Sequence, residues 1–528
     1  MDGDMGTVVV ASDRRIDTEH TPAVRVLTAP GESHEVSAEL REKLCFLESG
    51  ELLVVTGSQM DQHVLAFRDD LRRRGVAYSV RVCPLNELRS LYAASPLPLG
   101  RPAATQEGER RESATQSKVV EIFAGAVREG ASDIHFFDEE HETRIRIRVN
   151  GLLEDYAPLP AVPHKQGVEL RAAIYQSMSD IADPTFKPHQ PQDARMKESV
   201  VKPIGLYGAR IATRPLDKGM MMVCRLLTQR KGGPLSLPAL GYLPEQDALV
   251  SEMTENKQGI HIFAGATGSG KSTSLESLIT RLIKNFHHQL NVLTLENPPE
   301  YKIVGARQTP VINDDWVGGI KNAMRLDPDV IMIGEMRDLS SAQSAFQAAL
   351  TGHGVWTTLH ANDPFGILQR LDDLQLDPGL YSDASLVRGL IYQCLVPIVC
   401  PHCSVPMAQD RGAHSAEFVR RVERACAEND ADLSAVRLIH PQGCDRCRRG
   451  LAGRSVVAEV VSPTQRRLDV YRKQGKTAAR QTWLREDGGI SRAAHVKKLI
   501  ASGRVDPVLA EALVCRLDYD DILLSDAT

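Results

Sequence analysis

One glycine-rich segment has the residues to hold phosphate groups. GATGSGKS, Gly265 to Ser272, matches G-x-x-x-x-G-K-[ST] in full. Its glycines let backbone N–H groups curl around phosphates, while Lys271 neutralises the β and γ charges and Ser272 offers a hydroxyl to Mg²⁺. The alternative is a plain glycine-rich turn before a helix. The predicted nucleotide-binding residues are Gly265, Ala266, Thr267, Gly268, Ser269, Gly270, Lys271, Ser272 and Thr273.

Acids and one histidine follow apolar segments further along the chain. Glu296 and Glu300 stand in TLENPPEY, Glu335 follows DVIMIG, and His360 closes GVWTTLH. Hydrolysis of a nucleotide needs a carboxylate that orients or activates water and a group that completes the Mg²⁺ shell. Solvated loop acids and a packed histidine are the alternatives. Their common position at strand ends favours catalysis, with His360 as a γ-phosphate sensor.

Four cysteines form two C-x-x-C pairs. Cys400 and Cys403 stand in CPHC, Cys444 and Cys447 in CDRC, with residues 404 to 443 between the pairs. Two such turns can complete a tetrahedron of thiolates around Zn²⁺, and with four thiolates such a site is structural. Unmetallated structural thiols are the alternative. His402, Cys394 and Cys426 are interpreted as bystanders.

The elements around these residues alternate between short apolar strands and helices from residue 258 onward. Strands are expected in GIHIFAG, NVLTLE, DVIMIG and GVWTTLH, and helices in SLESLITRLIKNF and SSAQSAFQAALTG. This alternation predicts a parallel sheet with helices on both faces. Ligands of such sheets bind at the carboxyl ends of the strands, where the candidate residues stand.

The rest of the chain divides into further segments. Residues 1–100 predict a small α/β docking domain, 101–116 a flexible linker rich in polar residues, and 117–228 a second α/β domain built from hairpins. A hinge is expected over 229–241, the parallel-sheet domain with the phosphate loop over 242–395, the zinc module over 396–460 and a helical region over 461–528. No chemistry is visible in that last region.

Composition excludes some classes of protein. The 528 residues carry a net charge of −5, with 42% hydrophobic and 25% charged residues. This balance is ordinary for a soluble globular protein and offers no field that would attract nucleic acid. Neither a secretory signal nor an apolar run of spanning length is visible, so we expect a cytoplasmic protein that meets the membrane only through a partner.

The motifs together resemble one family. GATGSGKST, TLENPPEY, GEMRD and TGHGVWTTLHAND resemble the Walker A, aspartate box, Walker B and histidine box of the type II secretion and type IV pilus assembly ATPases. ASDIHFF, RIRIRVNGLL and PQDAR resemble its upstream signatures, and GLAGRSVVAEV follows the cysteines as in assembly and secretion members. The resemblance runs from about Val119 to Val461.

This resemblance implies an architecture and an activity. The fold would be a multidomain α/β protein: a RecA-like P-loop motor with a parallel sheet, a PAS-like α/β domain before it and a zinc module. ATP would lie between motor and PAS-like domain in a homohexameric ring, with Arg210 and Arg225 approaching the phosphates. Exposed salt bridges are the alternative for these arginines. Glu335 would reach Mg²⁺ together with Ser272, most simply through a water.

The implied output is assembly of a type IV pilus or a type II secretion pseudopilus through an inner-membrane platform protein. A cytoplasmic-face anchoring protein would dock on residues 1–100, and the motor would be peripheral at the inner membrane. The motifs do not decide which machine it serves. The zinc module and the long N-terminal region favour assembly or secretion over retraction.

Two residues depart from the family pattern. Asn297 replaces the acid of the aspartate box, which leaves Glu296 as first choice for the water-orienting base and Glu300 as second. Asn150 replaces an acid at a turn, where the two are equivalent. The alternatives are an ATP-binding scaffold ring with little hydrolysis, favoured by Asn297, and a retraction or nucleic-acid translocation motor.

Overall fold

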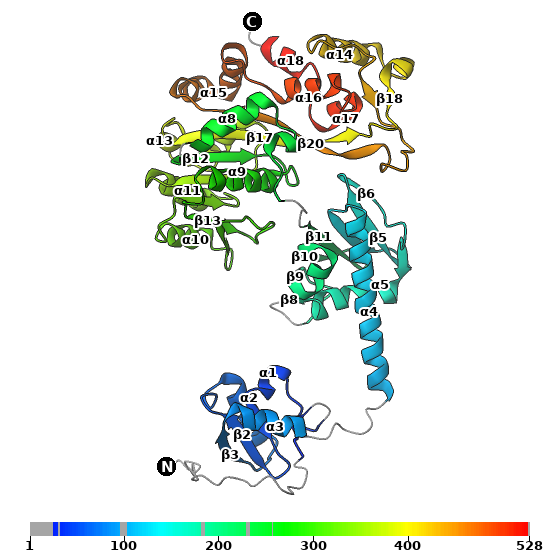
Figure 1. Ribbon diagram of the computed structural model, residues 1–528, viewed down its shortest axis with the longest axis vertical. Coiled ribbons are helices and arrows are strands. Elements are labelled where there is room, and N and C mark those ends of the chain that lie inside the picture. The colour runs from blue at the N-terminus through cyan, green and yellow to red at the C-terminus, as the bar shows by residue number, and fades with distance from the viewer. Residues whose placement is uncertain are drawn as a thin grey trace. The chain divides into compact units, whose positions relative to one another are not determined.

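The computed structural model describes residues 25–29, 32–94, 103–180, 185–228, 233–255 and 257–525. They form two compact units, Met1–Ala114 and Thr115–Thr528 (Figure 1). Among the described residues, none of the helices has the length and apolar character needed to cross a membrane.

The N-terminal unit is built on a three-stranded sheet in the order β1-β2-β3. Its strands are β1 (Leu44–Phe46), β2 (Glu51–Val55) and β3 (Ser79–Cys83), and its helices are α1 (Ala38–Arg41), α2 (Gln62–Arg73) and α3 (Leu85–Ala94). The central strand β2 is buried along Leu52, Leu53 and Val54, which pack to both sides of the sheet. The predicted α/β character of this region is confirmed, because β2 is followed by α2 and β3 by α3.

Helix α4 (Ala103–Arg128) corrects the predicted linker over 101–116. The segment is helical from Ala103, and residues 101 and 102 lie outside the described residues. Its alanine, glutamate, glutamine and arginine residues favour a helix even without an apolar face. Further along α4, Val119, Phe123 and Ala126 recur at helical spacing and are buried against the following domain.

The domain over residues 117–228, called here the preceding domain, contains an antiparallel sheet in the order β6-β5-β4-β11-β10-β9-β8. The strands are β4 (Asp133–Asp138), β5 (Glu142–Val149), β6 (Leu152–Asp155), β7 (Ala161–Pro163, beside β5), β8 (Ser179–Asp180), β9 (Gln192–Met196), β10 (Leu206–Pro215) and β11 (Met220–Thr228). The helices are α5 (His164–Ala172), which continues as a π-helical turn (Ala173–Ser177), and α6 (Glu198–Val201) with a 3₁₀ turn (Lys202–Ile204). Burial alternates along β5, so its arginines lie on the face opposite the core. The predicted hairpins β4–β5 and β10–β11 are confirmed.

The domain that carries the phosphate-loop sequence, called here the phosphate-loop domain, contains a seven-stranded sheet in the order β14-β13-β15-β16-β12-β17-β20. Its strands are β12 (Gly259–Ala264), β13 (Val292–Glu296), β14 (Ala306–Pro310), β15 (Val330–Ile333), β16 (Gly354–Leu359), β17 (Val387–Val399) and β20 (Leu451–Val461). All neighbours are parallel except β17 and β20, which are antiparallel. The four predicted strands are confirmed, whereas β14, β17 and β20 were not predicted.

Helices cover both faces of this sheet, as predicted. They are α8 (Pro244–Glu255), α9 (Lys271–Asn285), α10 (Trp316–Ala323), α11 (Leu339–Leu350), α12 (Pro364–Asp373) and α13 (Pro378–Tyr381). One hydrophobic cluster joins the sheet to α8 and α9, another joins it to α10, α11 and α12. In the predicted hinge over 229–241, the short helix α7 (Leu237–Leu240) buries Leu237 against the first cluster, while 229–232 lie outside the described residues.

The chain between β17 and β20 carries the cysteines, and the chain after β20 is helical as predicted. The insert contains β18 (Val405–Pro406), two 3₁₀ turns (Met407–Gln409 and Arg411–Ala413), α14 (Ala416–Ala427) and β19 (Arg437–Leu438). The C-terminal helices are α15 (Gln465–Glu486), α16 (Arg492–Ala501), α17 (Pro507–Leu513) and α18 (Tyr519–Ser525). Buried residues of α14, α16 and α17 share one hydrophobic cluster.

Candidate nucleotide site

The phosphate-loop sequence connects the end of β12 to the start of α9. Gly268 and Gly270 have φ of 79° and 87°, which side-chain-bearing residues rarely adopt. A Cβ on Gly265 would lie 2.3 Å from the Gln393 carbonyl oxygen. Lys271 Nζ donates to the carbonyl oxygens of Gly265 (2.7 Å) and Ala266 (3.1 Å). Burial lowers the pKa of Lys271. Hydrogen bonds from Lys271 thus hold the two ends of the loop together.

Gln393 braces this loop, and sequence reasoning missed it. It is fully buried on β17, where its Nε2 donates to the Ser269 carbonyl oxygen at 2.7 Å. Its Oε1 accepts from the Tyr242 hydroxyl, also at 2.7 Å. The available signal was a single amide inside the apolar run LIYQCLVPIV, because a buried polar side chain needs partners. Gln393 and Tyr242 therefore tie the loop to β17 and to the chain before α8.

Glu296 is the last residue of β13 and is 9% exposed. Its Oε1 accepts hydrogen bonds from Thr294 Oγ1 (2.6 Å) and Gln308 Nε2 (3.0 Å). Burial raises the pKa of Glu296, and the two hydrogen bonds oppose that shift. A carboxylate with a raised pKa at a strand end suits acceptance of a proton.

Glu335 lies within a series of polar contacts that also includes His360. Its Oε1 is 3.1 Å from His360 Nε2, and its Oε2 accepts from Arg337 Nε at 2.9 Å. Arg337 Nη1 continues to Asp314 Oδ1 at 3.2 Å, and Asn297 Nδ2 donates to the same oxygen at 3.1 Å. These contacts run from His360 through Glu335, Arg337 and Asp314 to Asn297 in TLENPPEY, where Asn297 acts as a donor.

Arg210 and Arg225 lie opposite each other on β10 and β11 of the preceding domain. Arg225 Nε donates to Asp133 Oδ1 at 3.0 Å, and Asp133 is 5% exposed. Within the described ranges Arg210 has no ion-pair partner, and burial lowers its pKa while nearby Glu300 opposes the shift. Arg210 is thus available to an anion, whereas Arg225 is held by Asp133, a residue that sequence reasoning did not select.

A cavity of about 1040 Å³ unites these groups within the unit Thr115–Thr528. The predicted residues that line it are Thr267, Gly268, Ser269, Gly270, Lys271, Ser272, Thr273, Glu296, Glu300, Glu335, His360, Arg210 and Arg225. Gly265 and Ala266 are not among its lining residues. Arg454 of β20 lines the cavity as well and was not selected, although it stands in the quoted segment GLAGRSVVAEV.

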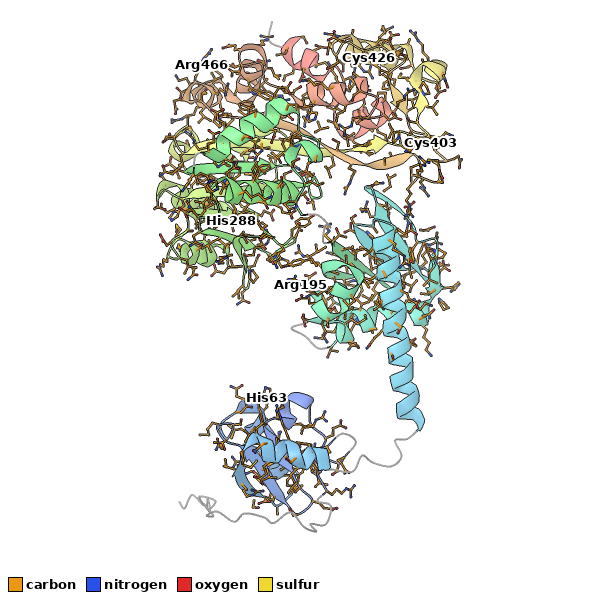
Figure 2. The ribbon with its side chains drawn as sticks, in the orientation of Figure 1. His63, Arg195, His288, Cys403, Cys426 and Arg466 are labelled. Atoms are coloured by element: carbon orange, nitrogen blue, oxygen red, sulfur yellow. The ribbon has the colours of Figure 1, made fainter. Side chains whose placement is uncertain are left out.

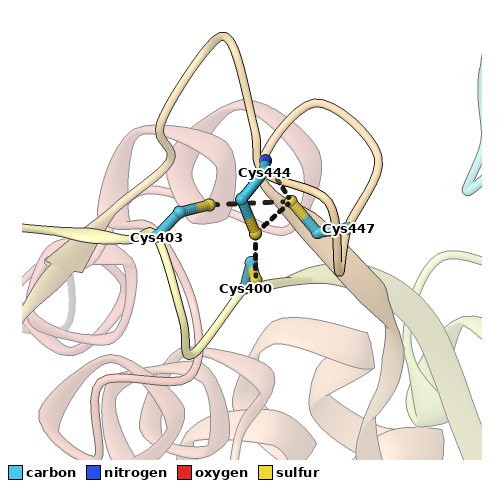
Figure 3. Close-up of side chains that lie close together, drawn as sticks. All are labelled: Cys400, Cys403, Cys444 and Cys447. Carbon is cyan, nitrogen blue, oxygen red and sulfur yellow. Dashed lines mark hydrogen bonds between the residues drawn. The ribbon is translucent and has the colours of Figure 1, made fainter.

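The four predicted cysteines converge at the base of the β17–β20 insert (Figure 3). Their Sγ atoms all lie within 4.8 Å of one another. The Sγ pairs Cys400–Cys444, Cys403–Cys447 and Cys444–Cys447 are separated by 3.9, 3.6 and 3.6 Å. Four thiolates about 2.3 Å from a tetrahedral Zn²⁺ would be roughly 3.8 Å apart, so the arrangement fits zinc.

The cysteines interpreted as bystanders lie elsewhere. Cys426 is on α14, labelled apart from Cys403 in Figure 2, and is buried in a hydrophobic cluster. Cys394 is on β17, where its Sγ contacts the Val457 carbonyl oxygen at 3.8 Å. Neither belongs to the group of four.

Comparisons with known proteins agree with this geometry. Residues 109–513 match the model of a family described as Type II/IV secretion system protein. Type II secretion system protein E of Pseudomonas aeruginosa is 33% identical over 362 residues, which are 67% of this chain and 66% of that protein. The type IV pilus assembly ATPase PilB of Thermus thermophilus is 30% identical over 426 residues, 76% of this chain and 45% of that protein. The chain therefore spans less than two thirds of the length of these relatives.

A solved structure shares the fold. The X-ray structure of the Legionella pneumophila ATPase DotB aligns at a TM-score of 0.50 and 22% identity, covering 73% of this chain and 92% of that one. At this identity the likeness shows the fold alone.

Proposed function

The chain belongs to the Type II/IV secretion system protein family, and from this premise we propose that it is an ATPase that converts ATP and water to ADP and phosphate. The observation that carries the proposal is the single cavity lined by the phosphate loop, three acids, His360 and two arginines. These are the groups that phosphoryl transfer to water needs: a phosphate cradle, a base and mobile cations.

Each group has a role in the proposed reaction. Water attacks the γ-phosphorus while the bond to the β–γ bridging oxygen breaks, and Glu296 accepts the proton that water loses. Its raised pKa suits a base that must release the proton again. Glu300 lines the same cavity and is the second choice. His360, in contact with Glu335, would sense the γ-phosphate.

Positive charge at the phosphates would come from several sources. Lys271 would leave its two loop carbonyls for the β- and γ-phosphates. Ser272 and Glu335 would hold Mg²⁺, which supplies charge neutralisation when bound. Arg210 and Arg225 belong to another domain, so their approach to the phosphates would couple hydrolysis to domain movement.

We further propose the output of this reaction. The chain would act as a cytoplasmic homohexameric motor, peripheral at the inner membrane, that drives assembly of a type IV pilus or a type II secretion pseudopilus. It would act through an inner-membrane platform protein, with an anchoring protein on residues 1–100. The names of the relatives and the tetracysteine cluster support assembly or secretion. Zn²⁺ would be held structurally by the four thiolates.

The second candidate is a scaffold ring that binds ATP without turnover, which Asn297 favours because an amide cannot take a proton. Phosphate release by the purified full-length protein distinguishes the two. We expect release in the wild type and near-complete loss with Lys271→Ala and with Glu335→Gln. Lys284→Ala, on the exposed face of the same helix as Lys271, is the matched control and should be unaffected. The proposal would be refuted if the wild type released no more phosphate than a protein-free control, or if Lys271→Ala released phosphate as fast as the wild type.

A further inference from the structure

The loop that carries His360 is held by the C-terminal helices. This histidine loop, residues 360–363, connects β16 to α12, and His360 at its start is 3.1 Å from Glu335. Its last residue, Asp363, is buried and caps α12, accepting from the Gly366 N–H at 2.8 Å. The far end of the loop is thus fixed within the motor.

Arg492 reaches the loop from α16. Its Nη1 donates to the Asn362 carbonyl oxygen at 2.8 Å, although the two residues are 130 positions apart in sequence. The guanidinium lies over the rings of Tyr392 (5.3 Å) and Tyr519 (5.1 Å), on β17 and α18. Aromatic rings on two elements therefore restrict the direction in which Arg492 points.

Lys476 reaches the same loop from another helix. Its Nζ, on α15, is 2.5 Å from Asp363 Oδ2, and the carboxylate side chain of Asp363 is 7% exposed. Asp363 uses its other oxygen to cap α12. Two cations from two C-terminal helices thus contact neighbouring residues of a four-residue loop.

A buried ionic cluster anchors Arg492 itself. Glu459 on β20 is fully buried, and its Oε1 accepts from the Arg492 backbone N–H at 2.8 Å. Arg480 on α15 donates to both oxygens of Glu459, at 3.0 and 2.5 Å. The Arg480 fork thus ties α15 to β20, and the Arg492 N–H ties the start of α16 to the same strand of the sheet that carries the site.

We propose that Arg492 is a positioning residue for ATP hydrolysis, which holds the histidine loop so that His360 stays in register with Glu335, with Lys476 as a second support. The inference rests on the proposed ATPase function. It assigns to the C-terminal helices a task at the site, where sequence reasoning saw packing alone. Movement of α15 or α16 would then alter turnover without any contact with the nucleotide.

The test is a double-mutant cycle in the full-length protein. Arg492→Gln keeps a polar side chain but is shorter and removes the charged donor, and it should lower kcat about tenfold, the effect of a barrier raised by about 1.4 kcal/mol. KM for ATP should stay nearly unchanged. In a His360→Ala background, Arg492→Gln should have no further effect on kcat, because the loop then has no histidine to position.

Further variants distinguish an effect of positioning on kcat from an effect of the lost charge or of impaired folding. Lys498→Gln, on the same helix but in an exposed pair with Glu245, removes an equal charge and should leave kcat unchanged. Arg492→Lys should recover part of the activity. If Arg492→Gln lowers the thermal midpoint, Lys476→Gln replaces it in the cycle, since the Lys476 side chain is 38% exposed.

The outcomes bear on different statements. If Arg492→Gln lowers kcat by the same factor with and without His360→Ala, the inference is overturned and the ATPase function stays intact. A kcat of Arg492→Gln equal to that of Lys498→Gln would have the same consequence. Absence of ATP hydrolysis in the wild type would instead refute the proposed function on which the inference rests.

Discussion

Replacing Glu459 by glutamine is expected to destabilise the phosphate-loop domain strongly. The Glu459 carboxylate is fully buried and accepts both hydrogen bonds from Arg480, whose side chain is 3% exposed. Glutamine preserves the shape but leaves the buried Arg480 guanidinium without the carboxylate that accepts both of its hydrogen bonds. Breaking a buried ion pair from one side costs about 3–5 kcal/mol.

The loss can be measured by tryptophan fluorescence during urea unfolding. All three tryptophans, Trp316, Trp356 and Trp483, lie in the phosphate-loop domain and the C-terminal helices, so the signal reports on this part of the chain. With a slope of about 3 kcal/mol per molar urea, the midpoint should fall by roughly 1 M or more. The midpoint is the reliable quantity, because the whole chain does not unfold in one step.

Two controls make the prediction specific. Glu486→Gln removes one partner of the exposed pair with Arg466 on α15 and should cost less than about 1 kcal/mol. The double variant Glu459→Met with Arg480→Met removes both charges of the pair and should recover much of the stability. A Glu459→Gln midpoint equal to that of Glu486→Gln would refute this account. So would a double variant as unstable as the sum of the two singles.

Further predictions concern the base, the cysteines and the arginine pair. Gln308→Leu removes a hydrogen bond that lowers the pKa of Glu296, so this pKa should rise further. Because the base must be ionised, the acid limb of the pH profile of kcat should move to higher pH. An acid limb that does not move would contradict the role of Glu296 as the base. Cys444→Ser should reduce bound zinc from about one per chain, measured by metal analysis, whereas a zinc-free wild type would refute a zinc site. Asp133→Asn releases Arg225 from its carboxylate and should lower KM for ATP several-fold; a raised KM would show that the pair supports binding instead.

The local parts of the site could be predicted from the sequence. The phosphate loop needs glycines, a lysine and a hydroxyl at fixed spacing, and the four apolar strands around it are short and buried on both faces. The acids follow because parallel strands end at one edge of the sheet. These features depend on a few neighbouring residues, so the pattern alone indicates them.

Other parts depend on contacts between distant residues. Gln393 contacts Ser269 across 124 positions, and Arg492 contacts Asn362 across 130, so no spacing could indicate either pair. Strand β17 escaped prediction because its apolar run alone does not distinguish a strand from a buried helix. The prediction of a flexible linker was wrong over 103–116, because a polar composition does not exclude a helix when the residues have high helix propensity.

The antiparallel pair β17–β20 has a consequence for how this chain could have evolved. Val399 and Leu451 are register partners, and the Cys400 N–H donates to the Gly450 carbonyl oxygen at 2.7 Å. The chain therefore leaves the sheet and returns to it at almost the same point. A tight turn could join the two strands there. Residues 400–450 therefore form an insertion that could be gained or lost in evolution without changing the strand order of the sheet. What such a deletion would uncover is the hydrophobic surface of α16 and α17 beneath α14, so loss of the insertion would select for new polar residues on those two helices.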